Sequence, residues 1–356
     1  MDDAAGCCDL PTDVLVEILL RLPPSSRRRA RLVCRHWRDI VGEHTTEMRS
    51  RVKALLWWNA AYIIDDLSSS STGSCRELWR SRRSELIGTC NGLLCFCNNE
   101  AASGGVITLV NPAISETLSL PALPCARLFI GRDCWNYWDQ AYSFAYHPTS
   151  GRYKVVHVPC SFGHVCEFKD VRMLTLGETS WREVPDGLEG GARCNLDAGI
   201  VSIDGITHWV TEGAAPRVVS FDLEDERITS LAELPAQAQP AGPDHYRLTE
   251  VHGRLGIVWI MAKGRRWSRR YSLRRQYLPW PHFVYGEYIL TREESSLHGH
   301  HKRKGPSLSG EVVRVGQQDH GTLVANIKGA NFHSRCRTFA YVETTEPLSV
   351  YEANKY

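Results

Sequence analysis

The apolar residues between Leu10 and about Leu56 recur with the 3.6-residue period of amphipathic helices. The first such stretch, LPTDVLVEILLRLP, ends at Pro23 and Pro24, which cannot continue a helix. Its apolar side consists of Leu10, Val14, Leu15, Ile18, Leu19 and Leu22. We therefore expect a short helix that starts near Pro11 and buries one side.

A second helix is expected to follow, capped by Ser25 or Ser26 and carrying RRRARLVCRHWRDIV. Its apolar stripe consists of Ala30, Val33, Cys34, Trp37, Ile40 and Val41. At about 100° per residue, Cys34 and His36 would lie about 200° apart, too far to share a metal ion easily. Cys34 is therefore interpreted as a small apolar residue of the stripe. Two or three short amphipathic helices are expected in all, and so short a unit should pack on a partner or on the rest of the chain.

From about residue 85 the pattern changes to short strands separated by turns. Asn91-Gly92 and Asp204-Gly205 are strong signals for two-residue hairpins, and His252-Gly253 is a weaker one. Strand, turn and strand units recur about every 40 to 50 residues, which is typical of four-stranded propeller blades. We expect about five or six such units, with an open β-sandwich as the alternative. The serine-rich stretch 66–74 is expected to form a loop between the two regions.

The helical region closely resembles the F-box. That family has Leu-Pro, a helix rich in Leu and Ile, a second Leu-Pro, and then Arg-x-Val-Cys-(Lys/Arg)-x-Trp-Arg. This chain has both Leu-Pro pairs and the Val33-Cys34-x-x-Trp37-Arg38 core at the expected separations, but carries Arg27–Arg29 where many members have a leucine. The resemblance implies docking on a Skp-type adaptor through Leu10, Pro11, Leu15, Ile18, Leu19, Leu22, Pro23, Val33, Cys34 and Trp37.

The strand-rich region is similar to the F-box-associated domain of plant F-box proteins, a kelch-like propeller. The similarity is strong over 86–235 and fades over 263–320. The expected fold is thus α+β and multidomain, with a small N-terminal helical F-box followed by an all-β propeller-like domain. We place the F-box at 7–50, a connecting segment at 51–84 and the F-box-associated β-propeller-like domain at 85–350.

Composition narrows the class of protein further. The 356 residues carry a formal net charge of +2, so no overall field favours nucleic acid or a membrane as a partner. The 13 cysteines are odd in number and irregularly spaced, and the N-terminus is acidic, which predicts reduced thiols in the cytoplasm, the nucleus or both. The longest apolar run, ALLWWNAAYII, is too short to span a bilayer and is interpreted as core.

Three other clusters carry reactive or charged residue types. Cys90, Cys95 and Cys97 lack a second Cys-x-x-Cys pair for zinc, so we expect them to pack in the core. The histidines and cations of 298–305 are interpreted as a loop rather than a metal site or a nuclear localisation signal. The arginines and aromatics of 263–280 could bind RNA, but a solvated hairpin is preferred. No catalytic motif is present, and neither a metal nor a cofactor is expected.

The loop 131–140 is the candidate for a target-binding surface. It contains Trp135, Tyr137 and Trp138, which are residue types that anchor protein interfaces. We predict that they contact a target protein. The alternative, to which we give equal weight, is that one or two of them cap the core of a blade.

The family resemblance implies a non-catalytic substrate receptor of a Skp-cullin-F-box ubiquitin ligase. The helical region would dock on the Skp adaptor, which links it to the cullin and RING subunits, and the propeller would hold an unidentified target protein. One alternative is an RNA-binding propeller that uses 263–280. Another is a lectin or an enzyme-type propeller, which would need clustered carboxylates or a polar pocket at its axis.

Overall fold

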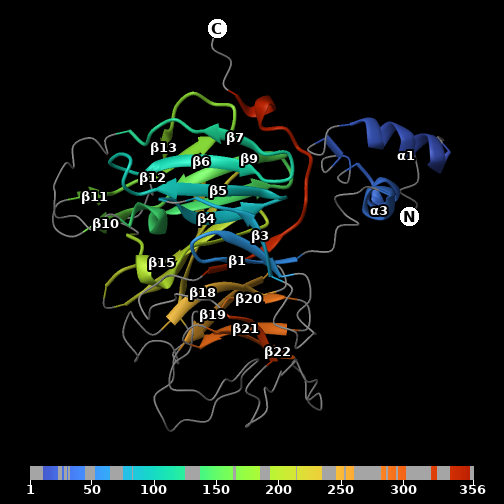
Figure 1. The fold of residues 1–356 in the computed structure, drawn as a ribbon. Coiled ribbons are helices and arrows are strands. Elements are labelled where there is room, and N and C mark those ends of the chain that lie inside the picture. Colours follow the sequence, from blue (N-terminus) through green and yellow to red (C-terminus); the bar gives the residue numbers. More distant parts are fainter. Residues whose placement is uncertain are drawn as a thin grey trace.

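The computed structural model has short N-terminal helices followed by antiparallel sheets, in agreement with the predicted fold class (Figure 1). It describes residues 11–22, 26–27, 30, 33–44, 53–64, 75–81, 83–124, 137–162, 166–184, 193–213, 215–234, 246–251, 254–259, 282–285, 288–293, 296–301, 322–326 and 337–352. Between 282 and 326 only the backbone is described. None of the helices in these ranges is long and apolar enough to cross a membrane.

The helical domain contains α1 (Thr12–Arg21) and α3 (Arg35–His44), which pack on each other. Its small core consists of Leu15, Leu19, Ala30, Ile40 and Val41. The stretch expected to carry the second helix is divided, because the chain turns at Val33 and α3 begins only at Arg35, which is within the two or three short helices predicted. Cys34 therefore precedes the helix, and the angular argument that separated it from His36 does not apply.

The sheets account for most of the chain. The first contains β1 (Lys53–Trp57), β2 (Ala61–Ile64), β3 (Cys75–Trp79) and β24 (Arg337–Tyr341). The second contains β4 (Glu85–Cys90), β5 (Leu93–Asn98), β6 (Val106–Asn111) and β7 (Glu116–Ser119). The third contains β8 (Tyr142–His147), β9 (Arg152–His157), β12 (Val171–Thr175) and β13 (Arg182–Val184).

The fourth sheet contains β14 (Val201–Ile203), β15 (Ile206–Val210), β16 (Arg217–Asp222) and β17 (Arg227–Glu233). A hairpin follows, made of β18 (Tyr246–Val251) and β19 (Arg254–Trp259). The last four-stranded sheet contains β20 (His282–Tyr285), β21 (Tyr288–Glu293), β22 (Ser296–His301) and β23 (Thr322–Asn326). A second hairpin, β10 (Cys160–Phe162) with β11 (Cys166–Phe168), projects from the third sheet. The described chain thus holds five four-stranded sheets, as expected for a propeller.

The innermost strands close into a ring. Contacts run from β24 to β4, β8, β14, β18 and β20 in turn, and β20 contacts β24 again. Closure depends on the C-terminal strand β24, which pairs with β1 from Lys53↔Tyr341 to Trp57↔Arg337. The two ends of the β-region therefore belong to one sheet, which removes the free sheet edges that an open sandwich would have.

This closure corrects the predicted domain boundary. The segment 51–84 was expected to connect the domains, but β1, β2 and β3 form three of the four strands of the first sheet. The propeller accordingly begins at Lys53, and the serine-rich stretch 66–74 falls between β2 and β3, outside the described residues. The reason is topological: β1 gains its inner partner only from the far end of the chain, which local patterns cannot reveal.

The turn chemistry is as predicted where it is described. Asn91-Gly92 joins β4 to β5 with φ angles of 49° and 87°, and Asp204-Gly205 joins β14 to β15 with 47° and 82°. Positive φ at both positions is the requirement of the tight turn whose twist matches paired strands. The strands β18 and β19 pair up to Val251↔Arg254, and the turn 252–253 lies outside the described residues.

Buried cysteines fill the spaces between sheets. Cys95 and Cys97 on β5 are fully buried in the core between the second and third sheets, which confirms their predicted packing role. Burial raises the pKa of both thiols well above its usual value. They are therefore protonated at neutral pH and poor nucleophiles.

His157 on β9 is a buried histidine in the same core. Its ring packs on those of Tyr142 and Phe168, with centroid distances of 4.9 and 4.5 Å. Burial, and secondly the charge of Arg172, lowers the pKa of His157 from its usual 6.5 to about 3. The folded protein thus holds this ring neutral.

A pH-dependent stability should result. Between about pH 6.5 and 3 the unfolded chain binds a proton at His157 and the folded chain does not, so the free energy of unfolding should fall as the pH falls. The slope from this group is at most about 1.4 kcal/mol per pH unit, and it vanishes above pH 7. Denaturant unfolding at several pH values from 7 to 4.5 measures this effect. The free energy of unfolding should fall less steeply with falling pH for His157→Phe than for the parent chain. Equal slopes would mean that the folded protein protonates His157.

Candidate functional site

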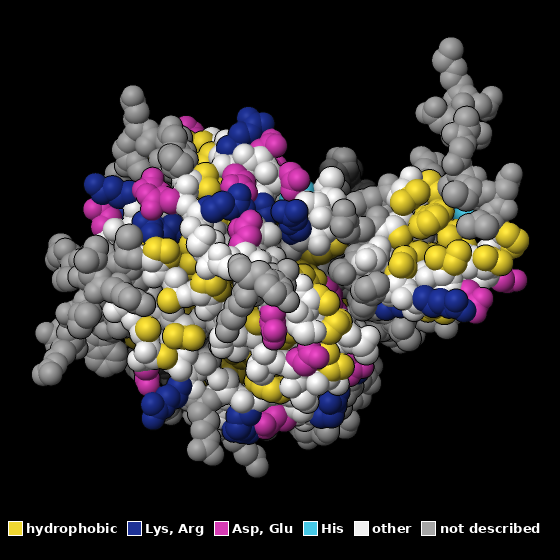
Figure 2. All heavy atoms as spheres, turned by 90° about the horizontal axis from the view of Figure 1, so that it is seen from above, with side chains coloured by type: hydrophobic (Ala, Val, Ile, Leu, Met, Phe, Trp, Pro, Cys, Tyr) yellow, Lys and Arg dark blue, Asp and Glu magenta, His cyan; other side chains and the backbone are white. Residues whose placement is uncertain are grey.

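Exposed apolar side chains gather on the helical domain. Six large apolar side chains are exposed in the described part of the chain, and four belong to this small domain, namely Val14, Ile18, Leu20 and Val33. Figure 2 shows hydrophobic atoms concentrated on the lobe that α1 and α3 form beside the propeller. Apolar side chains left in water at this density mark an interaction surface.

The predicted adaptor-binding residues divide into two groups. Leu15 and Leu19 are buried in the helical core, where Trp37 and Leu22 also pack, so these four support the surface from within. Ile18 and Val33 are 41% and 62% exposed and can contact a partner directly. Pro11 is exposed and Cys34 is half-buried. Leu10 and Pro23 lie outside the described residues.

Two exposed residues of α1 were missed as contacts. Val14 was placed on the apolar side without a role, and Leu20 was not considered. On a helical wheel Val14 and Ile18 lie on one flank of the buried Leu15 and Leu19 face, while Leu20 lies on the other flank. The sequence signal that could have identified them is that α1 is apolar around most of its circumference. The small helical core can bury only one side of the helix, so the other apolar side chains are left for a partner.

Arg27 explains the departure from the F-box pattern. Its side chain is buried, and Nη1 donates a hydrogen bond to the carbonyl oxygen of Leu20 at 3.2 Å. Leu20 is in the last turn of α1, where carbonyls have no partner within the helix. The arginine therefore satisfies the end of α1, which a leucine at this position could not do.

The target-binding prediction fails at Trp138. Its side chain is only 2% exposed, and its ring packs on Phe162 and Phe168 at 4.6 and 6.1 Å between centroids. The residue belongs to the core between the second and third sheets, because it sits in the 3-10 turn η2 (Trp138–Ala141) that enters β8. Tyr137 is 43% exposed, and Trp135 lies outside the described residues.

The inner strands line a cavity of about 250 Å³ at the propeller axis. Five of these strands each place one hydroxyl residue in its lining: Thr89, Ser143, Ser202, Thr249 and Thr338. The charged residues of the lining are Asp139, Arg247, Glu250 and Arg337. Sequence patterns did not reveal this cavity, because its lining is assembled from short segments of five strands that are far apart in the chain.

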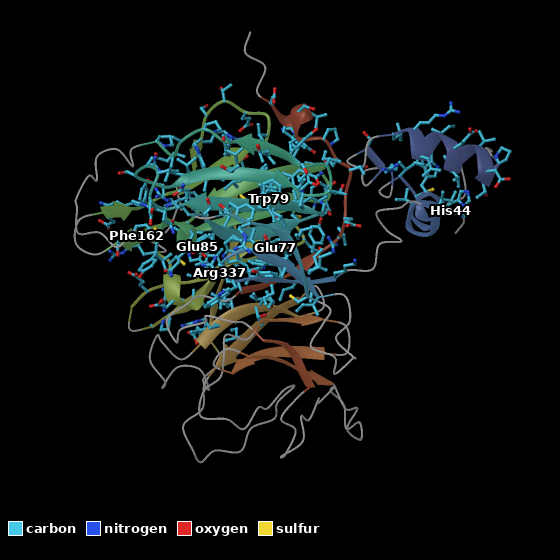
Figure 3. All side chains as sticks on the ribbon, viewed as in Figure 1. His44, Glu77, Trp79, Glu85, Phe162 and Arg337 are labelled. Atoms are coloured by element: carbon cyan, nitrogen blue, oxygen red, sulfur yellow. The ribbon has the colours of Figure 1, made fainter. Side chains whose placement is uncertain are left out.

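A buried ion pair joins three sheets next to this cavity. Arg337, labelled in Figure 3, begins β24 and places Nη2 2.7 Å from Oδ2 of Asp139. Its Nη1 donates to the carbonyl oxygen of Leu86 at 3.1 Å. Asn99 donates to Oδ1 of Asp139 at 2.9 Å and accepts from the Asp139 backbone N–H at 3.0 Å. The group ties the closing strand to the second and third sheets.

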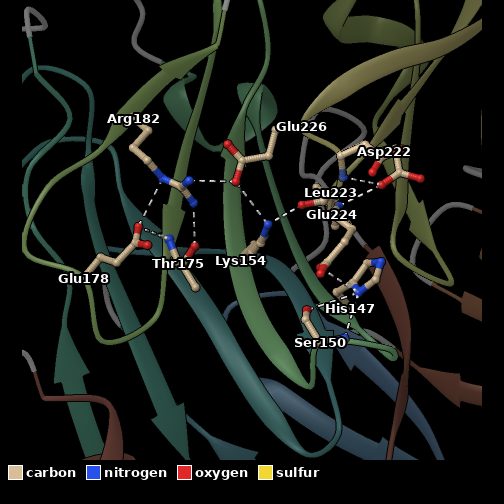
Figure 4. A network of polar contacts seen from close by, with 11 residues as sticks. His147, Ser150, Lys154, Thr175, Glu178, Arg182, Asp222, Leu223, Glu224 and Glu226 are labelled. Carbon is tan, nitrogen blue, oxygen red and sulfur yellow. Dashed lines mark hydrogen bonds and ion pairs between the residues drawn. The ribbon is translucent and has the colours of Figure 1, made fainter. Parts of the chain in front are cut away.

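A second polar network joins the third and fourth sheets (Figure 4). Lys154 is buried on β9, donates to the Leu223 carbonyl oxygen and lies 3.4 Å from the carboxylate of Glu226. Arg182 binds the same carboxylate at 2.8 Å, and His147 Nδ1 lies 3.2 Å from Glu224. Lys154 and Arg182 are thus paired with Glu226 across the sheet boundary, which indicates a role in packing the β16–β17 turn.

The structure tests some of the other sequence predictions, which concern metal ligands and the segments 298–305 and 263–280. No group of three or more potential metal ligands occurs in the portion of the chain that the structure covers. The predicted loop at 298–305 is wrong at its start, because β22 continues through His301. The segment 263–280 lies outside the described residues.

The chain matches two family models: F-box associated beta propeller domain over 62–268, and F-box domain over 7–45. F-box protein At3g07870 of Arabidopsis thaliana is 25% identical over 329 residues, covering 77% of this chain and 74% of that protein. F-box/LRR-repeat protein At2g43260 of the same plant is 24% identical over 305 residues, covering 74% and 67%. The solved structure of TolB from Acinetobacter baumannii aligns with 76% of this chain and 66% of the TolB chain, with 11% sequence identity and a TM-score of 0.37.

These matches agree with the two structural units. The F-box match contains α1 and α3, and the propeller match begins in β2, upstream of the boundary that the sequence pattern suggested. The propeller match alone spans more than half of the chain. This protein therefore belongs to the plant F-box proteins that carry an F-box associated beta propeller domain.

Proposed function

We propose that the protein is the substrate-recognition subunit of a Skp-cullin-F-box ubiquitin ligase. The observation that carries the proposal is the set of exposed apolar side chains on α1 and at Val33, in a domain that matches the F-box family. Exposing apolar side chains to water is unfavourable in free energy, and burial against a partner removes this penalty. The partner is a Skp-type adaptor, and through it the cullin and RING subunits.

The propeller would hold the target protein while the F-box is anchored. The chain enters the propeller at Lys53, which pairs with Tyr341 at the end of β24. A target lysine held close to a charged ubiquitin carrier reacts at a raised effective concentration, so the receptor acts by positioning and performs no chemistry itself. We place this activity in the cytoplasm, the nucleus or both, where the cysteine content predicts that the protein resides.

The double variant Ile18→Asp with Val33→Asp should bind the adaptor at least tenfold more weakly. Both side chains are exposed in the free protein, and burying each on docking would contribute about 1 kcal/mol or more to adaptor affinity. The aspartate variant loses this contribution, and a carboxylate buried in the interface adds a desolvation penalty. Isothermal titration of purified adaptor into the full chain measures the effect.

Val350→Asp is the matched control, because Val350 is an apolar side chain of similar exposure in the propeller-bound 3-10 turn η6 (Leu348–Tyr351). Adaptor affinity should be the same for this variant and the parent chain. If the F-box double variant stays folded and binds as tightly as the control, the proposed docking surface is wrong.

A chain that starts at residue 51 provides a second test, because it removes the F-box and retains the first strand of the propeller, β1. Captured target proteins should persist with this chain, while the adaptor should be lost. Loss of both sets of proteins would contradict a propeller that binds targets independently of the F-box.

A further inference from the structure

The axial cavity runs along the ring of inner strands. Its lining includes Asp139 and Gln140 of η2, and Leu196 and Ala198 of η3 (Leu196–Ala198), which directly precede β8 and β14. It continues along the strands to Thr89 in β4 and Ala340 in β24, each the last residue but one of its strand. Side chains of the inner strands therefore line the cavity over most of the strand length.

The hydroxyl groups of the cavity differ in how they are satisfied. Thr89 donates to the Ala340 carbonyl oxygen at 2.6 Å, and Ser143 and Ser202 share a hydrogen bond at 2.8 Å. Thr249 and Thr338 are each only 9% exposed, and the hydroxyl of Thr338 is buried without a hydrogen-bond partner within the described residues. A buried hydroxyl without a partner is unfavourable, so its presence beside a cavity points to a bound molecule.

The chemistry of the lining favours an uncharged ligand. Asp139 is paired with Arg337, and Arg247 and Glu250 add one charge of each sign, so the charges of the described lining cancel. Apolar walls lie between the hydroxyls and come from Ile87, Phe144, Leu248 and Phe339. A hydroxyl both donates and accepts, and an apolar wall covers carbon.

The size of the cavity limits the ligand further. A volume of about 250 Å³ is just below the range of pockets for drug-sized molecules, roughly 300–1,000 Å³, and corresponds to roughly eight waters. We propose that the axial cavity binds a small, neutral, polyhydroxylated molecule of about monosaccharide size. Its hydroxyls pair with those of Thr249 and Thr338, and its carbon skeleton contacts the apolar walls. The inference rests on the cavity alone and stands whether or not the F-box binds its adaptor.

Saturation-transfer NMR on the full chain tests the proposal with D-glucose, D-galactose, D-mannose, N-acetyl-D-glucosamine and myo-inositol, each at millimolar concentration. At least one of these should bind. A peptide that carries the bound sugar as its only glycan then identifies the source: equal or tighter binding indicates a sugar attached to a target, and loss of binding indicates a free metabolite. Binding by none of the five probes would show a cavity filled by water and would overturn the proposal.

The variant Thr249→Val with Thr338→Val separates recognition from stability. The Thr338 hydroxyl lacks a partner in the described structure and no hydrogen bond of the Thr249 hydroxyl is seen there, so the melting temperature should be unchanged or higher, while affinity for the bound probe should fall at least tenfold. Thr175→Val is the matched control. Thr175 is also buried, but its hydroxyl accepts from Arg182 at 3.0 Å and lies outside the cavity. That variant should lose stability and keep its affinity. Equal affinity in the double variant and the parent chain would place the ligand elsewhere.

Discussion

Replacing Arg337 with methionine is expected to lower the free energy of unfolding by about 3–5 kcal/mol, since it leaves a buried carboxylate without its counter-charge. The Asp139 side chain has no exposure to water, and Arg337 is its partner at 2.7 Å. The same guanidinium also donates to the Leu86 carbonyl oxygen, so the substitution removes two hydrogen bonds along with the charge. Because the group joins β24 to the second and third sheets, its loss should weaken ring closure. Urea unfolding followed by tryptophan fluorescence measures the change.

Two further variants test the physical cause. Asp139→Asn in the Arg337→Met background removes the stranded charge and keeps the acceptor for Asn99, so part of the lost stability should return. Arg76→Met is the control for an exposed pair. Arg76 lies 4.0 Å from Glu343, both are half exposed, and the loss should be under about 1 kcal/mol. A double variant no more stable than Arg337→Met would show that the buried charge is not the cause.

Trp138→Ala is expected to destabilise the propeller by about 3–5 kcal/mol, because it empties a fully enclosed site between the second and third sheets. The ring fills the space beside Phe162 and Phe168, which neighbouring side chains cannot close without moving the β10–β11 hairpin. Thermal and urea unfolding of the purified variant measure the loss.

Tyr137→Ala is the adjacent control, since Tyr137 is exposed and its replacement should change stability by about 0.5 kcal/mol or less. Tyr137 remains the described residue of 131–140 that is able to contact a target. If Trp138→Ala melts like the parent chain but captures fewer target proteins, the burial assigned to Trp138 is wrong and the loop would again be a target-binding candidate.

Local sequence determined the parts of this protein that depend on neighbouring residues. The helical period and the prolines located α1, and the Asn91-Gly92 and Asp204-Gly205 pairs located two hairpins, because positive φ angles are set within the turn itself. The recurrence of these units indicated a propeller. The F-box pattern identified the F-box domain, since its residues lie within about 40 positions of one another.

Only the tertiary structure decided which apolar residues face water. Leu15 and Ile18 belong to the same apolar side of α1, yet one is buried and the other exposed. Trp138 carries the residue type of an interface anchor and lies in a core. In both cases the exposure of the side chain depends on which other elements pack against it. Residue type alone cannot distinguish a core position from an interface position, because both are apolar.

Ring closure and the axial cavity were likewise beyond the sequence pattern. The strand β24 pairs with β1 from the opposite end of the chain, which moved the propeller boundary to Lys53. The cavity collects one hydroxyl residue from each of five strands, and a single serine or threonine in a strand carries no signal by itself. Sequence alone determined the local elements and the family, because those depend on short-range geometry. The structure determined closure, burial and the cavity, because these arise only when distant strands meet.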